Sequence, residues 1–421
     1  MTEKLLQFIW RFRYFNQYEL CIEGGENLSI IHPGILNINQ GPDFLNAKIR
    51  INKTTWVGNI ELHLLSSQWE KHEHGKDKNY NNVILHVVWI DDACLHDRNI
   101  PTLVLHQRIS GLLLEKYREW MESPSFIPCK SNIGQATEIV WTSWKERLLA
   151  ERLERKSTQI RRYLFQNKDH WEETLWWLIA GNFGSKVNTG LFETIARNVT
   201  VQILSKHKNH VHQLEALLMG QAGLLESDFQ DEYPNLLKKE YQFLKSKYHL
   251  PDVNQSAHFL RMRPGNFPTV RLSQLASLVH ASSHLFSRIM EIKTITEIRE
   301  LFAVTVSDYW TNHYVFDEVS PVRDKTLGVQ TVENIIINSL VPILYTYGIV
   351  HQYEAMKNKS ILWLESMPPE KNSILNEWKK INISAGNSFD SQALLELKTH
   401  YCDSRKCLEC AIGNSLLKRI S

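Results

Sequence analysis

Hydrophobic and polar residues alternate over the first third of the chain and recur at three- and four-residue spacing over the rest. Alternation is typical of half-buried strands, and the longer spacing is typical of helices that bury one face. The pattern predicts strands at about 43–51 and 56–65, joined by a hairpin through 52–55, and another at 101–106. VILHVVWI at 83–90 is almost continuously apolar, which predicts a strand buried on both faces.

Helices are predicted on either side of these strands. Residues 4–15 form an aromatic-rich opening helix, and a short helix ends near Gly75, with Ser67 and Glu70 placed as a capping box. From about Glu138 onward the apolar spacing is helical throughout, and the Trp and Phe stripes are expected to be core. The fold class is therefore α+β/α: a mixed N-terminal sheet with flanking helices, followed by a large all-α region.

Breaks in the pattern divide the chain. The proline-containing stretch at 124–133 is the best boundary, so we expect an α/β domain at 1–125 and a helical domain at 126–421. A weaker break near 320–331 would divide the helical domain again. The predicted helical domain ends in a cluster of cysteines.

Polar groups capable of proton transfer or metal binding gather in the strand region. Glu61 and His63 are two residues apart on one predicted strand, so their side chains share a face. Asp43 begins the preceding strand, on the side that alternation gives to Leu45, Ala47 and Ile49, and the hairpin brings it toward the end of the sheet that holds Glu61. An active site that uses these three groups is the leading hypothesis.

Two kinds of metal fit this stretch. Carboxylates such as Asp43 and Glu61 suit magnesium or manganese, whereas several imidazoles with one carboxylate suit zinc or iron. The imidazoles and the aromatic side chains that would support them are His63, His72, His74, His86, Trp69 and Tyr80. The alternative is that His86 is a hydrogen-bonded core residue and that the two histidines of the short helix are solvated.

Several of these residues, together with the order of the predicted elements, resemble the motif of a known superfamily. Pro42-Asp43 on one strand and Glu61-Leu62-His63 on the next, then a helix and a buried strand, resemble the PD-(D/E)XK nuclease superfamily over about the first 120 residues. The resemblance implies a restriction-endonuclease-like sheet, with magnesium or manganese on Asp43 and Glu61 and catalysis by Asp43, Glu61 and His63. His63 stands where the superfamily has lysine; a neutral imidazole can hold or deprotonate water but lacks a fixed positive charge.

The whole chain is also similar to an uncharacterised bacterial family, domain of unknown function 2851. Three motifs carry this likeness: WxxHxHxxDxxY at 69–80, RMRPGNFPTVR at 261–271 and YCDSRKCLECAIG at 401–413. The likeness covers nearly the whole chain and implies no activity.

Basic residues in the helical region are candidates for phosphate binding. One set lies on the predicted helix at 141–165 and includes Lys156 and Arg161; the other surrounds the Pro-Gly-Asn-Phe-Pro turn and comprises Arg261, Arg263 and Arg271. The alternatives are a solvated helix face with internal ion pairs and a structural loop whose arginines pair locally. The formal net charge of +2 means that any nucleic-acid surface is local.

Three cysteines near the C-terminus, Cys402, Cys407 and Cys410, have C-x4-C-x2-C spacing. Clustered cysteines in a cytoplasmic chain indicate metal more often than a disulfide. Cys129 or His400 would supply the fourth ligand of a zinc or iron–sulfur site. A reduced structural cluster is the alternative.

Charges at Glu3, Lys4, Arg11 and Arg13 interrupt the first apolar residues, and no run approaches the length of a membrane span, so a cytoplasmic protein without a membrane contact is expected. Two functions of different class follow. One is a metal-dependent nuclease that cleaves DNA or RNA. The other is a non-catalytic module, built on a decayed nuclease fold, that binds nucleic acid or a protein. A zinc-dependent hydrolase that uses the histidines is a third hypothesis, and stoichiometric zinc that is lost in His63→Ala would favour it.

Overall fold

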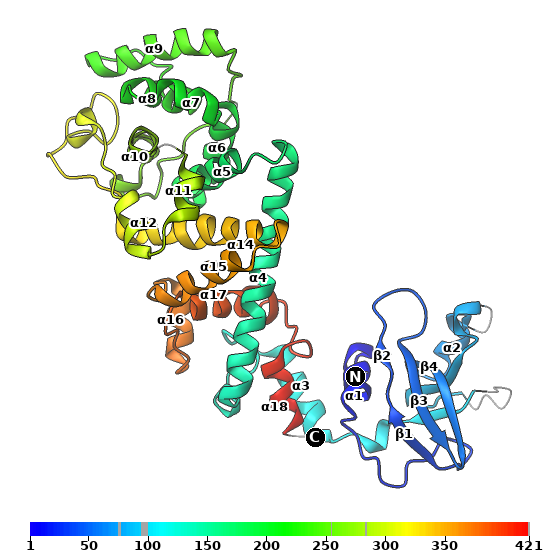
Figure 1. The fold of residues 1–421 in the computed structure, drawn as a ribbon. Helices are drawn as coiled ribbons and strands as arrows, with labels where there is room; N and C mark the ends of the chain where they lie inside the picture. The colour runs from blue at the N-terminus through cyan, green and yellow to red at the C-terminus, as the bar shows by residue number, and fades with distance from the viewer. Residues whose placement is uncertain (75–76, 94–99, 254, 283, 420–421) are drawn as a thin grey trace. The chain divides into compact units, whose positions relative to one another are not determined.

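The computed structural model describes residues 1–74, 77–93, 100–253, 255–282 and 284–419 (Figure 1). The chain divides into two compact units. The first comprises Met1–Glu146, Glu377–Ile383 and Leu395–Ser421, and the second comprises Arg147–Asn376 and Ser384–Leu394. The first unit thus runs past the predicted boundary at 125 and takes in the C-terminal segment.

A mixed sheet forms the N-terminal part of the first unit, as the alternation predicts. Its strands are β1 (Leu28–His32), β2 (Ile35–Leu36), β3 (Phe44–Ile51), β4 (Thr54–Leu65), β5 (Val83–Ile90) and β6 (Thr102–Val104). The strand order is β1-β3-β4-β5-β6, with β2 also paired to β3. The pairs that include β3 are antiparallel, whereas β4–β5 and β5–β6 are parallel. The sequence pattern did not predict β1 and β2.

The central strands β4 and β5 are buried on both faces where they pair. In β5, Leu85, His86, Val87 and Val88 are all fully buried, which confirms the prediction from VILHVVWI. In β4 the first four residues, 54–57, are all exposed, whereas four successive residues, 60–63, are all buried, so burial does not follow the alternation of the sequence. Polar side chains at these positions therefore need partners within the protein.

A bulge in β3 changes the face on which Asp43 lies. Phe44, Ala47 and Ile49 are each fully buried, and the register with β4 shifts between Phe44 and Ala47. Asn46 takes a left-handed backbone conformation there, with φ of 56°. The expectation that Leu45 shares a face with Ala47 is therefore wrong, because the bulge inserts one residue and reverses the alternation before it. Asp43 lies on the side of Glu61 instead.

Short helices complete this part of the unit: α1 (Glu3–Phe12), α2 (Gln68–Lys71), η2 (Lys78–Tyr80) and η3 (His106–Arg108). Both α1 and α2 pack against β4. The predicted capping box before α2 is wrong. Ser67 has helical dihedrals and no capping bond, and its hydroxyl and backbone N–H donate to the Asp92 carboxylate instead.

The rest of the first unit is helical: α3 (Gly111–Glu122), η4 (Ile133–Gln135), the start of α4 (Glu138–Gln166), the end of α16 (Ser373–Lys380), the end of α17 (Ser388–Glu396), the π-helix η8 (Leu397–Cys402) and α18 (Ala411–Lys418). Trp120 and Trp378 are fully buried in it. Helix α18 packs against α3 and η4.

The second unit is all helical apart from connections, as predicted from residue 138 onward. Besides most of α4 and parts of α16 and α17, its elements are α5 (Trp171–Phe183), α6 (Ser185–Asn198), α7 (Val201–His207), α8 (Val211–Gln221), α9 (Glu232–Tyr248), η5 (Pro264–Asn266), α10 (Pro268–Ala281), α11 (Leu285–Glu291), α12 (Ile295–Leu301), η6 (Asp308–Thr311), α13 (Val329–Ile335), the π-helix η7 (Ile336–Leu340), α14 (Val341–Val350) and α15 (Glu354–Ser366). One continuous core runs through it from Leu149 to Met367, and Trp and Phe side chains contribute to that core.

The continuous helical stretch Val329–Val350 is, among the described residues, the one long and apolar enough to cross a membrane. The sequence pattern had suggested no such run. Its apolar window is 67% buried within the second unit, as in a core helix of a globular protein. The stretch is therefore a packed element of the helical core.

A buried carboxylate lies among the helices of the second unit. Glu215 on α8 is fully buried, and both of its oxygens accept two hydrogen bonds. The donors are Ser273 and Ser307 at Oε1 (2.6 and 2.8 Å) and Tyr233 and Trp310 at Oε2 (2.6 and 3.1 Å). Such full satisfaction is what allows a carboxyl group to remain in a core.

Candidate metal centre

The site is built on β4 and β5 at the centre of the sheet. Glu61 and His63 on β4 are buried, with 5% and 1% exposure, and share one face of the strand as predicted. The parallel pairing sets His86 of β5 directly beside Glu61. His63 Nδ1 lies 2.9 Å from His86 Nε2, a hydrogen bond that fixes the orientation of the His63 ring.

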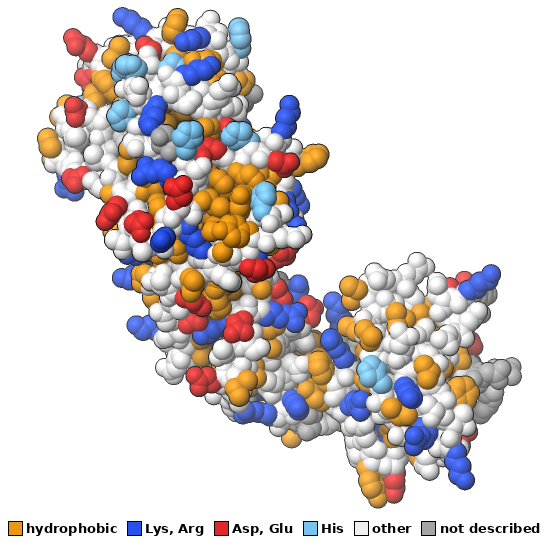
Figure 2. Space-filling model, viewed as in Figure 1, with side chains coloured by type: hydrophobic (Ala, Val, Ile, Leu, Met, Phe, Trp, Pro, Cys, Tyr) orange, Lys and Arg blue, Asp and Glu red, His pale blue; other side chains and the backbone are white. Residues whose placement is uncertain are grey.

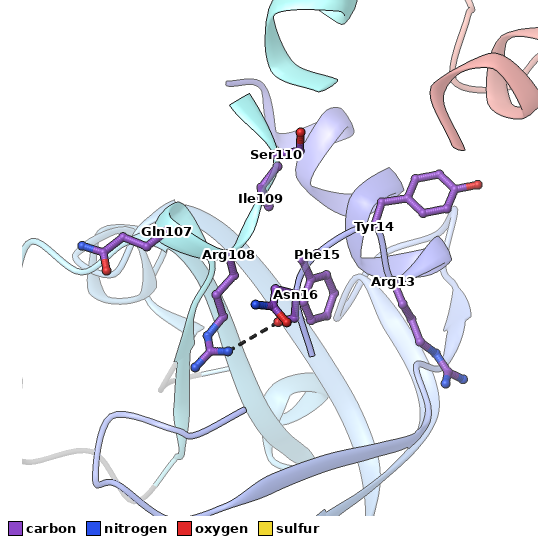
Figure 3. Close-up of a pocket in the computed structure, with 8 residues that line it drawn as sticks. All are labelled: Arg13, Tyr14, Phe15, Asn16, Gln107, Arg108, Ile109 and Ser110. Carbon is purple, nitrogen blue, oxygen red and sulfur yellow. Dashed lines mark hydrogen bonds between the residues drawn. The ribbon is translucent and has the colours of Figure 1, made fainter. Parts of the chain in front are cut away.

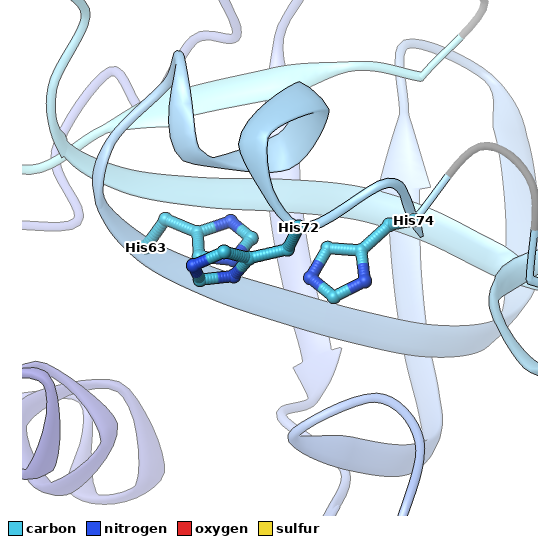
Figure 4. A group of neighbouring side chains, drawn as sticks. All are labelled: His63, His72 and His74. Atoms are coloured by element: carbon cyan, nitrogen blue, oxygen red, sulfur yellow. The ribbon is translucent and has the colours of Figure 1, made fainter.

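His72 and His74 reach the same place from the end of α2. The helix ends at Lys71, His72 caps it, and Glu73 takes a left-handed conformation with φ of 56°. The chain therefore turns so that both imidazoles face His63, as Figure 4 shows. Ring centroids are 5.1 Å apart for His63 and His72, 5.2 Å for His63 and His74, and 5.4 Å for His72 and His74. One ligand atom from each imidazole lies within 4.8 Å of those of the other two.

The Glu61 carboxylate borders this histidine trio. Its Oε1 lies 3.6 Å from His63 Nε2 and 3.4 Å from His74 Nε2. The geometry of the second contact does not make a hydrogen bond, so the buried His74 Nε2 has no hydrogen-bond partner among the described residues. Buried polar atoms without a partner are rare in proteins and are often explained by an ion.

Asp43 organises the site from the edge of β3. Its backbone N–H donates to Glu61 Oε2 (3.0 Å), and its own Oδ2 accepts from the backbone N–H of Leu62 (3.0 Å). Gln7 of α1 donates to the other oxygen, Oδ1, at 2.8 Å. The bonds to Glu61 and Leu62 tie Asp43 to β4 through both its backbone and its side chain, so Asp43 helps to hold Glu61 in place.

Burial controls the protonation of these groups. Burial, and then the charge of Asp43, raise the pKa of Glu61 to about 8, and burial raises the pKa of Asp43 to about 6. Burial, and then the neighbouring charge of His72, lower the pKa of His74. At neutral pH the metal-free site therefore favours a neutral Glu61 carboxyl beside neutral His74. A cation bound there would instead favour the ionised Glu61 carboxylate.

Aromatic side chains complete the surroundings. The Tyr80 ring stacks on His74, with centroids 3.9 Å apart, and Trp69 packs edge-on against His74 and tilted against His86. Burial and the charge of Glu61 raise the pKa of Tyr80 to about 12, so its phenol stays neutral. The motif WxxHxHxxDxxY thus supplies two of the three imidazoles and the aromatic wall behind them.

The donor set fits a transition metal. Three imidazoles and a carboxylate are typical ligands of zinc, and a ligating histidine usually donates its other ring N–H to an acceptor outside the ligand set, a role that an imidazole nitrogen can also fill. His63, His72 and His74, with Glu61 beside them, would hold such an ion, and His86 would be that acceptor. Magnesium, which prefers several oxygen ligands, fits this arrangement less well.

The predicted phosphate-binding residues belong to the second unit. Arg271 is mostly buried; burial lowers its pKa to about 10, and its guanidinium donates to Gln274, Asn266 and Thr331. Arg161 pairs with Glu154. Arg261 and Arg263 are exposed, and Lys156 is half-buried. Arg271 therefore secures the turn that precedes α10, and Figure 2 shows Lys and Arg interspersed with Asp and Glu on the visible face of the molecule.

Sequence reasoning missed two basic residues that share the sheet face of the site. Lys48 pairs with Val57 and Arg50 with Thr55, and alternation along β4 carries that face on to Glu61 and His63. Both basic side chains are exposed, and neither forms an ion pair with another described residue. The sequence offered one signal for this shared face: Lys48 and Arg50 alternate on the strand that precedes the one on which Glu61 and His63 alternate.

A separate hollow of about 520 Å³ lies near the N-terminal helix, lined by Arg13, Tyr14, Phe15, Asn16, Gln107, Arg108, Ile109 and Ser110 (Figure 3). None of the predicted site residues lines it. Its Arg108 guanidinium donates to the carbonyl oxygens of Asn16, Tyr18 and Glu19, so it ties two chain segments together. The hollow is therefore a structural junction rather than the candidate centre.

The fold and the site together define a class of protein: a mixed α/β unit with a histidine-rich centre, joined to a large helical unit. The chain belongs to the family described as "Protein of unknown function (DUF2851)", which matches residues 3–373. No curated protein and no solved structure matches it.

Proposed function

We propose that the sheet of the first unit holds a zinc ion and that the protein hydrolyses phosphodiester bonds in nucleic acid. The observation that carries the proposal is the convergence of His63, His72 and His74 beside the Glu61 carboxylate. Magnesium or manganese on Asp43 and Glu61, the other metal expected from the sequence, is less favoured because the groups that gather beside Glu61 are imidazoles rather than oxygen ligands.

The order of the surrounding elements supports a nuclease-like arrangement. Asp43 leads into β3, Glu61 and His63 lie on the antiparallel β4, and a helix then leads to the parallel β5. The resemblance to the PD-(D/E)XK superfamily implies this succession of carboxylate, strand, helix and buried strand. A restriction-endonuclease-like fold, with an imidazole in place of lysine, is therefore part of the proposal.

The environment of each side chain suggests its role in the reaction. Zinc would polarise a phosphoryl oxygen and acidify water, which compensates for the missing lysine charge. Glu61, whose pKa burial raises to about 8, can hold or release a proton near neutral pH. We assign the hydrogen of the His63–His86 bond to His63 Nδ1, with His86 Nε2 as its acceptor, because this tautomer presents the lone pair of His63 Nε2 on the side of Glu61.

Substrate contact is proposed for the exposed part of the same sheet face. Lys48 and Arg50 project from β3 beside Thr55 and Val57 of β4, several residues along the strand from Glu61. A nucleic-acid backbone that crosses this face would meet these two positive charges on one side of the scissile phosphate. Replacement of both by Ala should weaken binding at all sequences and reduce its salt dependence.

Metal analysis and a cleavage assay on the same preparations test the proposal. We expect about one zinc per chain at the site and cleavage of DNA or RNA by the zinc-loaded protein. His72→Ala removes an exposed ligand with little risk to the fold and should reduce zinc affinity at least about 10-fold and abolish cleavage. His106→Ala is the matched control, because His106 is also exposed but packs on Trp89 away from the trio.

Two results would overturn the proposal. Cleavage that requires magnesium, survives His72→Ala and is lost in Asp43→Asn would return the metal to the carboxylate pair. Well-folded protein that cleaves nothing with zinc, manganese or magnesium would favour the non-catalytic module, and salt-dependent binding of oligonucleotides would then distinguish a nucleic-acid partner from a protein partner.

A further inference from the structure

Four cysteines from two distant parts of the sequence meet in the first unit. Cys129 lies in the loop before η4, Cys402 ends η8, and Cys407 and Cys410 lie between η8 and α18. Cys129, Cys407 and Cys410 are buried, and each of these three thiols is close enough to Cys402 for its charge to raise the Cys402 pKa. None of the four is in a disulfide. The sequence left Cys129 and His400 as alternatives for the fourth ligand, and the proximity of the four cysteines favours Cys129.

His400 is directed elsewhere. Its Nε2 lies 3.8 Å from Glu396, one turn back along the helix, and its side chain is 42% exposed. The group is therefore a set of four thiols without an imidazole.

The chain around the cysteines is held in one arrangement. Gly413 lies so close to the Cys407 backbone that a Cβ on it would stand 2.3 Å from the Cys407 carbonyl oxygen. Arg405 takes a left-handed conformation with φ of 50°, and its guanidinium donates to the carbonyl oxygens of Trp120 and Ser123. Close packing and these bonds join the C-terminal segment to the end of α3 next to Cys129.

Polar N–H groups lie near one of the sulfurs. The backbone N–H groups of Gly413 and Ile412 and the Trp144 indole lie close enough to the Cys410 sulfur to offset part of the rise that burial causes in the Cys410 pKa. Cys410 also occupies the N-cap position of α18, where the helix dipole favours negative charge. Arg405 and Lys398 add positive charge near Cys407 and Cys402 respectively. Donors and cations near sulfur are what metal-bound thiolates require.

We propose that Cys129, Cys402, Cys407 and Cys410 hold an iron–sulfur cluster. C-x4-C-x2-C with a fourth cysteine elsewhere is the ligand run of plant-type two-iron clusters, although here the fourth cysteine precedes the run. In a tetrahedral zinc site the sulfurs would lie roughly 3.8 Å apart, given a Zn–S bond of about 2.3 Å. Among the described residues, the histidine trio forms a group of three whose ligand atoms all lie within 4.8 Å of one another, and the cysteines form no such group. A cluster, whose ligands are farther apart than those of one zinc ion, accommodates this arrangement.

Cluster binding requires that the thiols lose their protons. Burial raises the pKa of all four, to about 12 for Cys407, so without metal they remain neutral thiols. On binding, each thiol releases its proton and its sulfur donates an electron pair to iron; iron and sulfide come from the cell's cluster supply. The site lies outside residues 3–373, the part that matches the family, except for Cys129.

The test is anaerobic purification of the full chain, followed by measurement of iron, zinc and acid-labile sulfide, together with visible absorption. We expect equal amounts of iron and labile sulfide and a brown protein. Cys407→Ser should lose most of both, whereas Cys21→Ser, a control at a half-buried cysteine outside the group, should keep both. His63→Ala should also keep both, which separates this centre from the zinc proposed on the sheet.

Chelation provides a test that does not depend on how a variant folds. Wild-type chain stripped of metal should regain absorption and labile sulfide when iron and sulfide are restored, and should not do so after its thiols are alkylated. Zinc bound to the four cysteines without labile sulfide, or four reactive thiols with no metal in anaerobically purified protein, would overturn the proposal.

Discussion

The Glu61 carboxyl lies in a buried position beside Asp43 and two imidazoles, and burial raises its pKa to about 8 from an ordinary value of 4.5. A carboxyl whose folded-state pKa is raised stabilises the fold fully below its unfolded-state pKa and loses that contribution as pH rises through the folded-state value. We predict that the free energy of unfolding of metal-free protein falls between about pH 4.5 and about pH 8, by on the order of 2–4 kcal/mol. Urea unfolding at a series of pH values measures it, and Glu61→Gln should flatten the profile; an equally steep decline in that variant would contradict the assignment.

His86 acts on the proposed metal through His63 rather than by contact. Loss of its Nε2 acceptor, as in His86→Phe, should lower zinc affinity about 10-fold or more while the fold persists, because His63 loses its orientation. His86→Gln keeps an acceptor oxygen and should recover part of the affinity. Competitive zinc titration of the two variants measures the difference, and equal affinities in both would mean that His86 is only a core residue.

Some residues of the site follow from the sequence, and others do not. Glu61 and His63 were predicted to share a face because a strand's alternation is local and needs only neighbours in sequence. The approach of His72 and His74 depends on the left-handed turn at Glu73, which a spacing rule does not reveal. Nor does spacing reveal that Cys129 lies near Cys402, because that proximity depends on contacts between distant segments.

The bulge in β3 is the element that brings Asp43 to the site. Asn46, exposed at the bulge, has φ of 56°, a conformation that Gly and Asn adopt readily and β-branched residues do not. We predict that Asn46→Val destabilises the fold by about 1–3 kcal/mol and that Asn46→Gly is tolerated.

Thr55→Val is the matched control for that change. Thr55 is an exposed β4 residue opposite Arg50, and exchange of one β-branched residue for another should alter stability by less than about 0.5 kcal/mol. Chemical unfolding of the three variants gives the comparison. If Asn46→Val left the free energy of unfolding unchanged, the bulge would have to relax without cost, and the prediction would be wrong.

Elements with strong periodic patterns were predictable, and weak ones were not. β5 has eight apolar or buried positions in sequence, and the long helices repeat their apolar spacing over several turns. β2 has two residues, too few for any pattern, and the π-helix η7 at Ile336–Leu340 differs from its neighbours by hydrogen-bond register alone. Strand pairing and register depend on contacts between residues that are far apart in sequence. The order and register of the observed sheet therefore could not be predicted from the individual strands.

At the scale of the whole molecule, each of the two units has its own buried interior. The continuous core from Leu149 to Met367 lies within the second unit, whereas both candidate metal centres lie within the first. The C-terminal segment was assigned by sequence order to the helical domain, but contacts place Leu395–Ser421 in the first unit. We therefore expect the two units to unfold in separate transitions, so the full chain should not unfold in a single two-state transition.

Glu215 offers a test of that separation. Glu215→Leu would leave Ser273, Ser307, Tyr233 and Trp310 without their common acceptor, and should destabilise the second unit by about 3–5 kcal/mol. Burial raises the pKa of this carboxyl, so Glu215→Gln, which keeps the shape and one acceptor oxygen, should cost less. Unfolding followed by helical circular dichroism should show the transition of the second unit shifted to lower denaturant in Glu215→Leu. Zinc and labile sulfide bound to the first unit should stay at wild-type levels, because neither set of ligands shares a core with Glu215; loss of both metals in step with helicity would mean that the two units unfold as one.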